Sequence, residues 1–275
     1  MYEEDPSIEP EVRRCDLMDD EAILSLAREQ GISASAAQVE VLRRGIVPAR
    51  YAKNLLALSI DEQIRLGGSR ALVCGCGGLG GIVALLLARA GIGYLRLIDS
   101  DVFAPSNLNR QLLCHTDSLG LEKARVAEER VRSVNPLIDV EAHVVSLDET
   151  NANDLVRDVD VVLDAVDNLA ARFILADAAR RAGIPFIHAA VAGWWGQLST
   201  FLPGSDRRLG GIYGSRRAKD PSEDAIGVLG PTASIVGSLE ALEAIRVLGG
   251  RKPAYGDSLL YFDGESGRME IIALA

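Results

Sequence analysis

A glycine-rich turn that directly follows an apolar run carries the clearest chemical signal in the sequence. Gly75, Gly77 and Gly80 match the G-x-G-x-x-G spacing, and Gly78 lies within the same turn. Such glycines let the chain turn tightly and bring backbone N–H groups and a helix N-terminus against phosphate. Asp99 follows Gly80 by 19 residues, at the end of the next apolar run, where a carboxylate can bind a ribose hydroxyl. Because a glycine turn that serves only packing would not explain this acid, the pattern predicts a nucleotide site.

A polar turn after Asp99 supplies candidate phosphate ligands. It holds Asn107, Arg110 and Gln111, and Lys123 follows thirteen residues beyond Arg110, near the start of a predicted helix. A nicotinamide dinucleotide would also satisfy the glycine pattern, and Lys123 taken alone would be a solvated helix charge. An arginine and a lysine that converge on the end of a strand suit a triphosphate, whose charge exceeds that of a pyrophosphate bridge. The turn therefore favours a nucleoside triphosphate.

Two carboxylates end a later apolar run. Asp164 lies at its end, and Asp167 follows directly before Asn168. Ligands of open α/β sheets bind at the carboxyl edge of the strands, and Mg²⁺ is usually held by one or two carboxylates together with substrate oxygens. We therefore expect one of these carboxylates beside the phosphates. Asn168 is expected to cap a helix, to serve the site, or to do both.

The apolar pattern predicts the sheet edge that these residues need. Strands and helices alternate from residue 70 onward, which favours a Rossmann-like α/β fold: a mostly parallel sheet with helices on both faces and right-handed crossovers. The predicted strands are 71–74, 94–98, 159–165 and 185–191, and the predicted helices are 79–90, 120–133 and 168–182.

The pattern changes after residue 191. A further strand is predicted at 196–202 and a helix at 231–248, and the turn GESG joins two antiparallel C-terminal strands at 259–263 and 269–273. The polar, glycine-rich segment 203–229 is long for a structureless connection, and such connections are usually functional or mobile. We expect it to be a mobile crossover segment.

The first 49 residues form a separate predicted unit. An acidic leader over 1–18 precedes two short helices, the first ending at Gly31 and the second running from Ser33 to Leu42. A helix-turn-helix would have this form, but the charge of the chain disfavours DNA. We expect a helical N-terminal extension that serves packing or dimerisation, followed by one domain over 50–275.

The composition excludes several other classes of protein. The 275 residues include 29 Lys and Arg against 39 Asp and Glu, and a net charge of −10 would repel a nucleic-acid backbone. The longest strongly apolar stretch, 82–88, is far shorter than the roughly 20 residues of a membrane span. The acidic start shows no signal peptide, and the four cysteines do not form a disulfide framework. We expect a cytoplasmic protein that binds neither DNA nor membranes.

Together the motifs resemble those of the ThiF/MoeB/HesA adenylyltransferases, relatives of the ubiquitin-activating enzymes. The resemblance runs from about residue 50 to the C-terminus, so that 50–275 would form one adenylation domain. SNLNRQ and VDN after GCGGLG are far more specific than glycines alone. In chain order the motifs are RYAKN (50–54), GCGGLG (75–80), IDSD (98–101), SNLNRQ (106–111), Lys123, DAVDN (164–168) and GVLGP (227–231).

The resemblance implies an ATP- and Mg²⁺-dependent, homodimeric enzyme that acts on a ubiquitin-like sulfur-carrier protein, as in thiamine or molybdopterin biosynthesis. Such enzymes bind the C-terminal Gly-Gly of the carrier, align its carboxylate with the α-phosphate of ATP and form an acyl-adenylate with loss of pyrophosphate. By analogy, Asp99 would hold the ribose and Asp167 the Mg²⁺ ion. The nucleotide site would also include Asn107, Arg110, Gln111, Lys123 and Asn168, with Asn107, Arg110 and Lys123 on the phosphates.

Three departures from the family pattern qualify these expectations. Lys53 stands where many relatives carry an arginine that reaches the phosphates of the neighbouring subunit, so the charge is kept without the planar fork. GIYG (211–214) stands where a zinc-binding cysteine pair would fall, and no cysteine follows Cys114, so we expect no zinc site. SEDAI (222–226) lacks the cysteine with which some relatives take the acyl group or sulfur. A thiol or amine of another molecule would then intercept the adenylate.

Three other functions are compatible with the sequence. One is a family member that adenylates a peptide or a tRNA base, against which the acidic charge argues in the case of tRNA. An NAD-dependent oxidoreductase would have no use for Arg110 and Lys123 at the phosphate end. A nucleotide-binding scaffold without activity would not need Arg110, Lys123 and Asp167 together.

Overall fold

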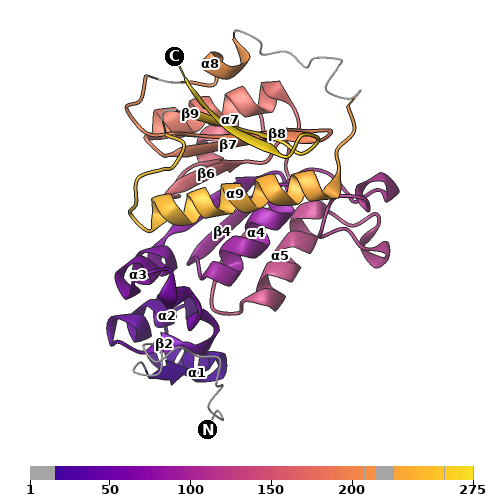
Figure 1. The fold of residues 1–275 in the computed structure, drawn as a ribbon. Helices are drawn as coiled ribbons and strands as arrows, with labels where there is room; N and C mark the ends of the chain where they lie inside the picture. Colours follow the sequence, from indigo (N-terminus) through magenta and orange to yellow (C-terminus); the bar gives the residue numbers. More distant parts are fainter. Residues whose placement is uncertain (1–15, 207, 215–225, 257, 275) are drawn as a thin grey trace.

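An eight-stranded sheet lies at the centre of the computed structural model (Figure 1), which describes residues 16–206, 208–214, 226–256 and 258–274. The strand order is β10-β9-β8-β7-β6-β3-β4-β5. Strands β3 to β7 pair in parallel, whereas β8, β9 and β10 continue the sheet in antiparallel pairs. The predicted fold class is thus confirmed. The strands are β3 (Arg70–Cys74), β4 (Tyr94–Ile98), β5 (Asp139–His143), β6 (Val161–Asp164), β7 (Phe186–Ala192), β8 (Trp195–Phe201), β9 (Ser258–Asp263) and β10 (Arg268–Ala273).

The strand order reverses direction beside β3. From β3 the chain moves to β4 and then β5 on one side, and it returns to place β6 on the other side of β3. The last paired residues of these two strands are Cys74 and Asp164. Ligands of open α/β sheets bind in the crevice outside the carboxyl ends of the strands at such a reversal. The topology therefore marks the loops after β3 and β6 as the place for a site.

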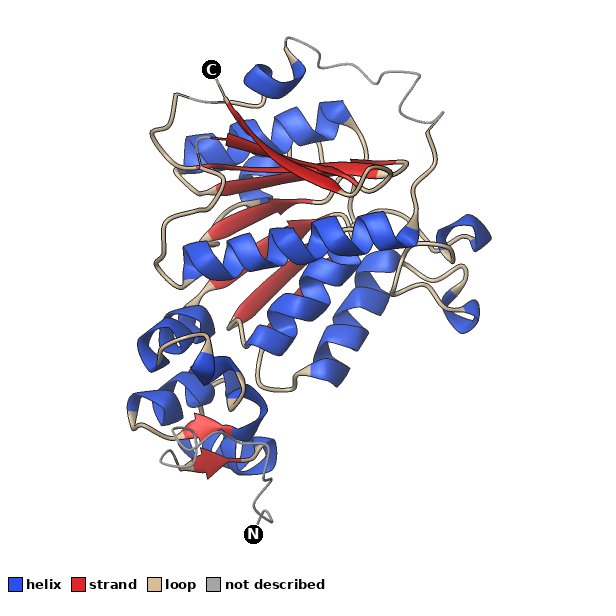
Figure 2. Ribbon diagram, in the orientation of Figure 1, coloured by secondary structure: helices blue, strands red, loops and turns tan. Residues whose placement is uncertain are grey.

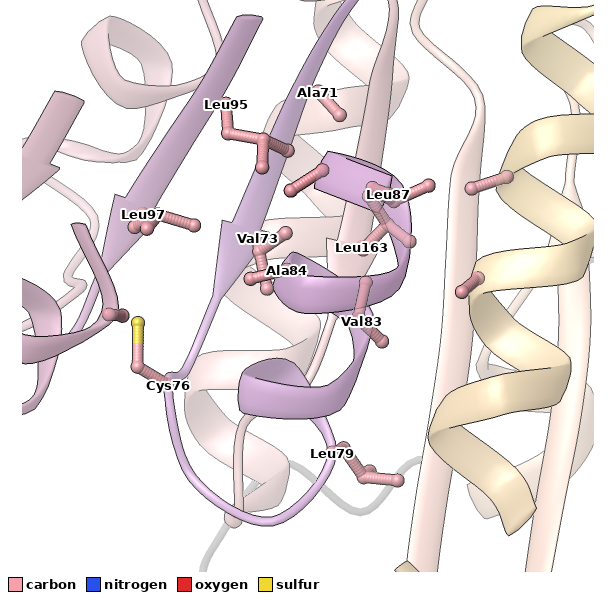
Figure 3. Packing of buried hydrophobic residues seen from close by; sticks show 14 of the residues in the cluster. Ala71, Val73, Cys76, Leu79, Val83, Ala84, Leu87, Leu95, Leu97 and Leu163 are labelled. Atoms are coloured by element: carbon pink, nitrogen blue, oxygen red, sulfur yellow. The ribbon is translucent and has the colours of Figure 1, made fainter. Parts of the chain in front are cut away.

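Helices α4 (Gly80–Ala90), α5 (Lys123–Val134) and α9 (Gly230–Leu248) cover one face of the sheet (Figure 2). Alternate side chains of β3 point to opposite faces, so that Val73 packs under these helices and Leu72 does not. Figure 3 shows Val83 and Leu87 of α4 packed between the strands and α9. Burying a side chain of this size stabilises the fold by about 1.5–3 kcal/mol.

Helices α6 (Ala152–Leu155) and α7 (Leu169–Ala182) cover the opposite face. Phe173 and Leu175 of α7 pack against Leu72 and Phe186 of the sheet, and Leu209 joins them from the segment before α8 (Gly210–Tyr213). Both faces of the parallel strands are therefore covered, as the apolar runs predict. Helices near 79–90, 120–133, 168–182 and 231–248 are confirmed, and no end differs by more than three residues.

The N-terminal helices lie at the opposite end of α4 from the crevice (Figure 1). Helices α1 (Asp20–Gln30), α2 (Ala34–Arg43) and α3 (Ile60–Gly68) pack there, with the short parallel strands β1 (Leu17–Met18) and β2 (Val47–Pro48). The buried Tyr51 hydroxyl donates to Gln38 Oε1 (2.8 Å) and accepts from Asn135 Nδ2 (2.7 Å), which ties these helices to the end of α5. The 3-10 helices are η2 (Ala49–Tyr51), η3 (Asn54–Leu56), η4 (Pro105–Asn107) and η5 (Thr116–Ser118).

Several elements depart from the sequence expectations. Strand β5 was not predicted, because only Val140 and Ala142 of its five residues are buried at the edge of the sheet. The segment 203–229 is not wholly structureless, since it contains α8. Residues 1–15 of the predicted acidic leader (1–18), residues 215–225 of the crossover segment and nearly all of SEDAI lie outside the described residues, whereas the end of the leader forms β1. The division of the chain at residue 49 stays a prediction. None of the described helices combines the length and the apolar character needed to cross a membrane.

Candidate nucleotide-binding site

The glycine turn between β3 and α4 is shaped by close backbone contacts. Gly75 has a positive φ of 97°, and a Cβ atom there would lie 2.4 Å from the carbonyl oxygen of Ala165. A Cβ atom on Gly80 would lie 1.7 Å from the carbonyl oxygen of Gly75. No side chain fits at either distance, so these two positions require glycine for the turn itself.

Gly77 and Gly78 are constrained less and face the polar segment that follows Asp99. A Cβ atom on Gly77 would lie 3.4 Å from Gln111 Nε2, and one on Gly78 would lie 3.3 Å from the Cβ atom of Ala233 and 3.8 Å from Arg110 Cγ. The turn and the segment that carries Arg110 therefore lie side by side. This contact brings together the two motifs that the sequence assigns to one nucleotide.

Asp99 connects the turn to the end of β4. Its Oδ2 accepts a hydrogen bond from the backbone N–H of Cys76 (2.8 Å), and its Oδ1 accepts one from the N–H of Asp101 (2.8 Å). Burial raises the pKa of this carboxyl above its usual value, although the two N–H groups oppose the shift. Each carboxylate oxygen can accept a second hydrogen bond. Asp99 can therefore accept a further hydrogen bond from a sugar hydroxyl.

The segment after Asp99 forms a lobe over residues 102–121 that projects beyond the sheet, on the right in Figure 1. Asn107 is buried and stabilises the lobe, because its Oδ1 accepts from the N–H of Ala104 (2.9 Å). Gln111 is also buried, and its Oε1 has no hydrogen-bond partner among the described residues. A buried amide oxygen without a donor is uncommon in folded proteins, and a bound group could supply one.

Arg110 and Lys123 are the cations of the site, and they are held differently. Arg110 Nη1 donates to the carbonyl oxygen of Ser106 (2.9 Å) and to Asn109 Oδ1 (2.9 Å), and no described acid pairs with it. Lys123 Nζ pairs with Asp101 Oδ2 at 2.9 Å, and its side chain is only 9% exposed whereas that of Asp101 is 62% exposed. Arg110 thus offers an uncompensated charge, and Lys123 shares its charge with a neighbouring acid.

The two carboxylates after β6 have different roles. Asp164 is fully buried, and its Oδ2 accepts from Arg172 Nε (2.8 Å) and His188 Nδ1 (2.7 Å). This oxygen is occupied by an internal ion pair, and Asp164 does not face a ligand. Asp167 is exposed on the following loop, so it is the carboxylate of this motif that can reach a metal ion.

Asn168 acts as the N-cap of α7. Its Oδ1 accepts from the N–H of Ala171 (2.9 Å), and its Nδ2 lies 3.3 Å from Asp167 Oδ1. The predicted capping role is therefore confirmed, and the same side chain touches the candidate metal carboxylate. A carboxylate near a helix N-terminus is also stabilised by the helix dipole.

Glu240 of α9 adds an uncompensated acid to the core beside Asp164. It is fully buried, and neither of its carboxyl oxygens makes a well-formed hydrogen bond within the described residues. Burial and the negative charge of Asp164 raise the pKa of Glu240 well above its usual value. Burial therefore favours the neutral form of Glu240, and Asp164 keeps Arg172 as its partner.

Lys53 lies apart from the other predicted residues. It directly precedes η3, where Asn54 Nδ2 donates to the carbonyl oxygen of Ala90 (3.1 Å) at the C-terminal end of α4. The glycine turn is at the other end of this 11-residue helix, and a helix of that length spans about 16 Å. The structure does not bring Lys53 to the site within one chain.

Sequence reasoning missed three residues that shape the site. Asp101 is the second acid of IDSD, and the motif alone does not indicate that it pairs with Lys123. His188 is far from Asp164 in the sequence, so the sequence does not indicate that the two side chains meet. The role of Arg172 was missed because Asp164, its partner, was a candidate metal ligand. The spacing of Arg172, four residues after Asn168, would have placed it over the first turn of α7.

Metal ligands other than Asp167 are sparse. The described part of the chain contains no group of three or more His, Cys, Asp or Glu side chains arranged to hold a metal ion. GIYG (211–214), which stands where a zinc-binding cysteine pair would fall, includes the end of α8 and contributes Tyr213 to a buried cluster. The absence of zinc stays a prediction.

The chain is similar to known proteins over most of its length. The ThiF family model matches residues 51–275. The chain is 37% identical over 222 residues to the sulfur carrier protein adenylyltransferase of Thermus thermophilus, covering 77% of this chain and 82% of that protein. It is 34% identical over 233 residues to the adenylyltransferase and sulfurtransferase MOCS3 of Xenopus laevis, covering 82% of this chain and 51% of that protein.

The fold is similar to solved structures as well. The structure of E. coli MccB with ATP gives a TM-score of 0.71 at 22% identity, covering 82% of this chain and 72% of that one. At this identity the match concerns the fold alone. The chain spans about half the length of several curated relatives that it matches, including MOCS3.

Proposed function

Because this chain belongs to the ThiF family, we propose that it is an ATP-dependent adenylyltransferase that activates the C-terminal carboxylate of a sulfur-carrier protein ending in Gly-Gly. The observation that carries the proposal is the gathering of the glycine turn, Asp99, Arg110 and Lys123 at the reversal of the strand order. The relative from T. thermophilus, which aligns over 82% of its length and is named for this activity, supports the same assignment.

The nucleotide would lie across the carboxyl ends of β3 and β4. The glycine turn and the N-terminal end of α4 would face the phosphates, because the helix dipole and the backbone N–H groups of such a turn favour an anion. Asp99 would accept a hydrogen bond from the ribose while it keeps its two backbone donors. Gln111 Oε1, which lacks a donor, would be satisfied by the nucleotide or by water that it orders.

Arg110 and Lys123 would neutralise the phosphates. Among the described residues, neutral oxygen atoms hold Arg110, so its charge is available to an incoming anion. Lys123 is paired with an exposed acid, and a triphosphate would compete with Asp101 for its ammonium group. The site therefore holds its cations near their working positions before the nucleotide binds, which lowers the cost of reorganisation.

Asp167 would hold Mg²⁺, assisted by Asn168. Asp167 is exposed at the same edge of the sheet and takes no part in the buried ion pair of Asp164, as a magnesium ligand requires. A magnesium site typically combines one or two carboxylates with phosphate oxygens and water. Bound Mg²⁺ would add positive charge at the phosphates where negative charge develops.

The reaction needs alignment and charge neutralisation more than proton transfer. The carrier carboxylate is already ionised at neutral pH, so it attacks the α-phosphorus atom without a general base, and the bond to pyrophosphate breaks. The residues of this chain would hold the two anions together against their repulsion. With no cysteine after Cys114, a thiol or amine of another molecule would receive the acyl group.

A homodimer would bring Lys53 to a phosphate. Lys53 cannot reach the site of its own chain, and Arg50 is held by an ion pair with Asp20 and a hydrogen bond to Val134 O (2.9 Å). Exposed apolar side chains on α9 and on the lobe are consistent with a covered surface, since monomers rarely expose large apolar patches. They are Val102, Leu108, Leu112, Leu121, Ile235 and Leu242, the last 61% exposed.

Subunit mixing tests this arrangement. Lys53→Ala and Arg110→Ala variants should each be nearly inactive, and a mixture should regain activity because one site of each mixed dimer receives both wild-type residues. Sedimentation analysis would establish the oligomeric state in parallel. A monomer at micromolar concentration, or a mixture as inactive as its components, would remove Lys53 from the site.

A cytoplasmic location is also part of the proposal.

The decisive experiment is ATP–pyrophosphate exchange with Mg²⁺ and a panel of carriers that end in Gly-Gly. Carrier-dependent return of radiolabel to ATP is expected. A carrier without its last two residues is the matched control and should give no exchange. ATP binding without exchange for any carrier would contradict the proposed substrate, and the absence of ATP binding would contradict the nucleotide site itself.

A further inference from the structure

A closed ring of hydrogen bonds lies beneath the loop that carries Asp167. Its members are Asp164 at the end of β6, Arg172 on α7, His188 on β7 and Tyr213 on α8. Arg172 donates from Nε to Asp164 Oδ2 (2.8 Å) and from Nη1 to the Tyr213 hydroxyl (3.1 Å). His188 contacts the same carboxylate oxygen through Nδ1 (2.7 Å) and the same hydroxyl through Nε2 (3.1 Å). β6 and α7 are neighbours in the chain, and β7 and α8 join them in this ring from later in the sequence.

The partners of the ring assign its protons. Asp164 can only accept, so the ring proton of neutral His188 sits on Nδ1 and its Nε2 is an acceptor. The Tyr213 hydroxyl therefore donates to His188 Nε2 and accepts from Arg172 and from Gln197 Nε2. Burial lowers the pKa of His188, which favours the neutral imidazole that this pattern requires.

Arg172 connects the ring of hydrogen bonds to the loop that carries Asp167. Its Nη2 donates to the carbonyl oxygen of Val166 at 2.8 Å, directly before Asp167 in the chain. On the other side of Asp167, Asn168 is fixed as the N-cap of α7. The backbone on either side of Asp167 is therefore held, although the Asp167 side chain itself is exposed.

Tyr213 is the member that comes from a different part of the fold. It is carried by the four-residue helix α8 in the segment between β8 and α9. Its aromatic ring packs edge-on against His188 (5.5 Å between centroids) and Phe173 (6.5 Å), which fixes the direction of the hydroxyl. The ring of hydrogen bonds is complete only while this segment is docked against α7 and β7.

We infer that Arg172 and Tyr213 are positioning residues for Asp167, so that the affinity of the site for Mg²⁺ depends on the docking of Tyr213. The inference rests on the proposed function of Asp167 as the metal carboxylate. Neither residue is placed in contact with substrate. Groups that orient a metal-binding side chain commonly change metal affinity or activity about 10- to 100-fold when they are removed.

Tyr213→Phe tests the inference because it removes the hydroxyl group and keeps the aromatic side chain. The Mg²⁺ concentration that gives half-maximal ATP–pyrophosphate exchange should rise about tenfold, and the rate at saturating Mg²⁺ should stay within about twofold of wild type. The matched control is Tyr94→Phe, which also loses a hydroxyl hydrogen bond, to Glu141, but at the opposite edge of the sheet. It should leave both quantities unchanged.

Amide hydrogen exchange supplies a readout that needs no activity. In Tyr213→Phe, exchange should increase in the loop 164–168 as well as in 208–214, because the ring joins them. Gln197→Leu should give a smaller change in the same direction, and it serves if Tyr213→Phe does not fold.

Two results would overturn the inference. One is exchange that increases in 208–214 alone, and the other is a lower rate at every Mg²⁺ concentration with no change in the half-maximal concentration. If the wild-type protein shows no pyrophosphate exchange with any carrier, the proposed function fails, but hydrogen exchange in 164–168 still decides whether the ring holds the loop.

Discussion

The two turns that border the crevice are built by opposite means. The turn after β3 depends on missing side chains, since Gly75 and Gly80 approach backbone oxygens at distances that exclude a Cβ atom. The turn after β6 depends on large buried side chains, since Arg172 binds both Asp164 and the carbonyl oxygen of Val166. In the proposed site, the first turn would bring its backbone to a phosphate, and the second would present the carboxylate of Asp167. Steric and electrostatic constraints thus share one site.

The glycine turn should be broken by a single methyl group. Gly80→Ala should destabilise the protein by about 5 kcal/mol, because the new Cβ atom would lie 1.7 Å from a backbone oxygen that cannot move away. Unfolding by urea would measure the change. Gly77→Ala is the matched control, because its nearest neighbour at 3.4 Å is a flexible Gln111 side chain. Equal losses in the two variants would show that the close approach at Gly80 is not the cause.

The turn after β6, here called the charged turn, should lose its support when Arg172 is replaced by an apolar residue. Arg172→Leu should cost about 4 kcal/mol, because it leaves the buried carboxylate of Asp164 without its charged partner. The same urea experiment measures this loss. Arg157→Leu removes an exposed ion pair with Asp154 and should change the stability by less than about 0.5 kcal/mol. A loss of that small size for Arg172→Leu would contradict the ion pair as the support of the turn.

Asp167→Ala separates the function of the charged turn from its support. The residue is exposed, so the stability should stay within about 0.5 kcal/mol of wild type. Mg²⁺-dependent pyrophosphate exchange should fall by about 10² to 10³, the usual effect of removing one group that neutralises developing charge. Full activity in a folded variant would exclude Asp167 from the site.

Glu240→Gln should give the smallest effect on stability, and the size of the effect depends on pH. The folded protein raises the pKa of Glu240, so this carboxyl contributes stability below the pKa of the unfolded chain, about 4, and loses it as the pH rises toward the folded pKa. Gln carries no titrating proton. The variant should therefore be more stable than wild type by about 1 kcal/mol at pH 8, or about 2–4 °C in Tm, and equal to it near pH 4. A gain that does not change with pH would contradict the buried proton.

The sequence allowed the parallel sheet and its helices to be predicted because their apolar runs are long and regular. It could not reveal β5, whose edge position leaves three of five side chains partly or fully exposed. It could not reveal α8 either, since a four-residue helix has no periodicity to detect.

The site was predictable where residues are near one another in sequence and not where they are distant. The glycine turn, Asp99 and the polar lobe follow one another along the chain, and the structure joins them. The pairing of Asp164 with His188 depends on neighbouring strands, so the sequence left Asp164 open as a metal ligand. Lys53 was placed by resemblance alone, and its separation from the glycine turn became visible only in the fold.

The position of β3 between β4 and β6 also determines when the crevice can form during synthesis. β3 and β4 are close in the chain and can pair early, whereas β6 follows only after β5 and α6 have been made. Contacts between distant segments form later because a longer loop must be closed. The crevice therefore has only one wall on a ribosome-bound chain that ends before β6. Tyr213 emerges later still, so a nascent chain would hold the glycine turn well before it could hold Asp167 in place.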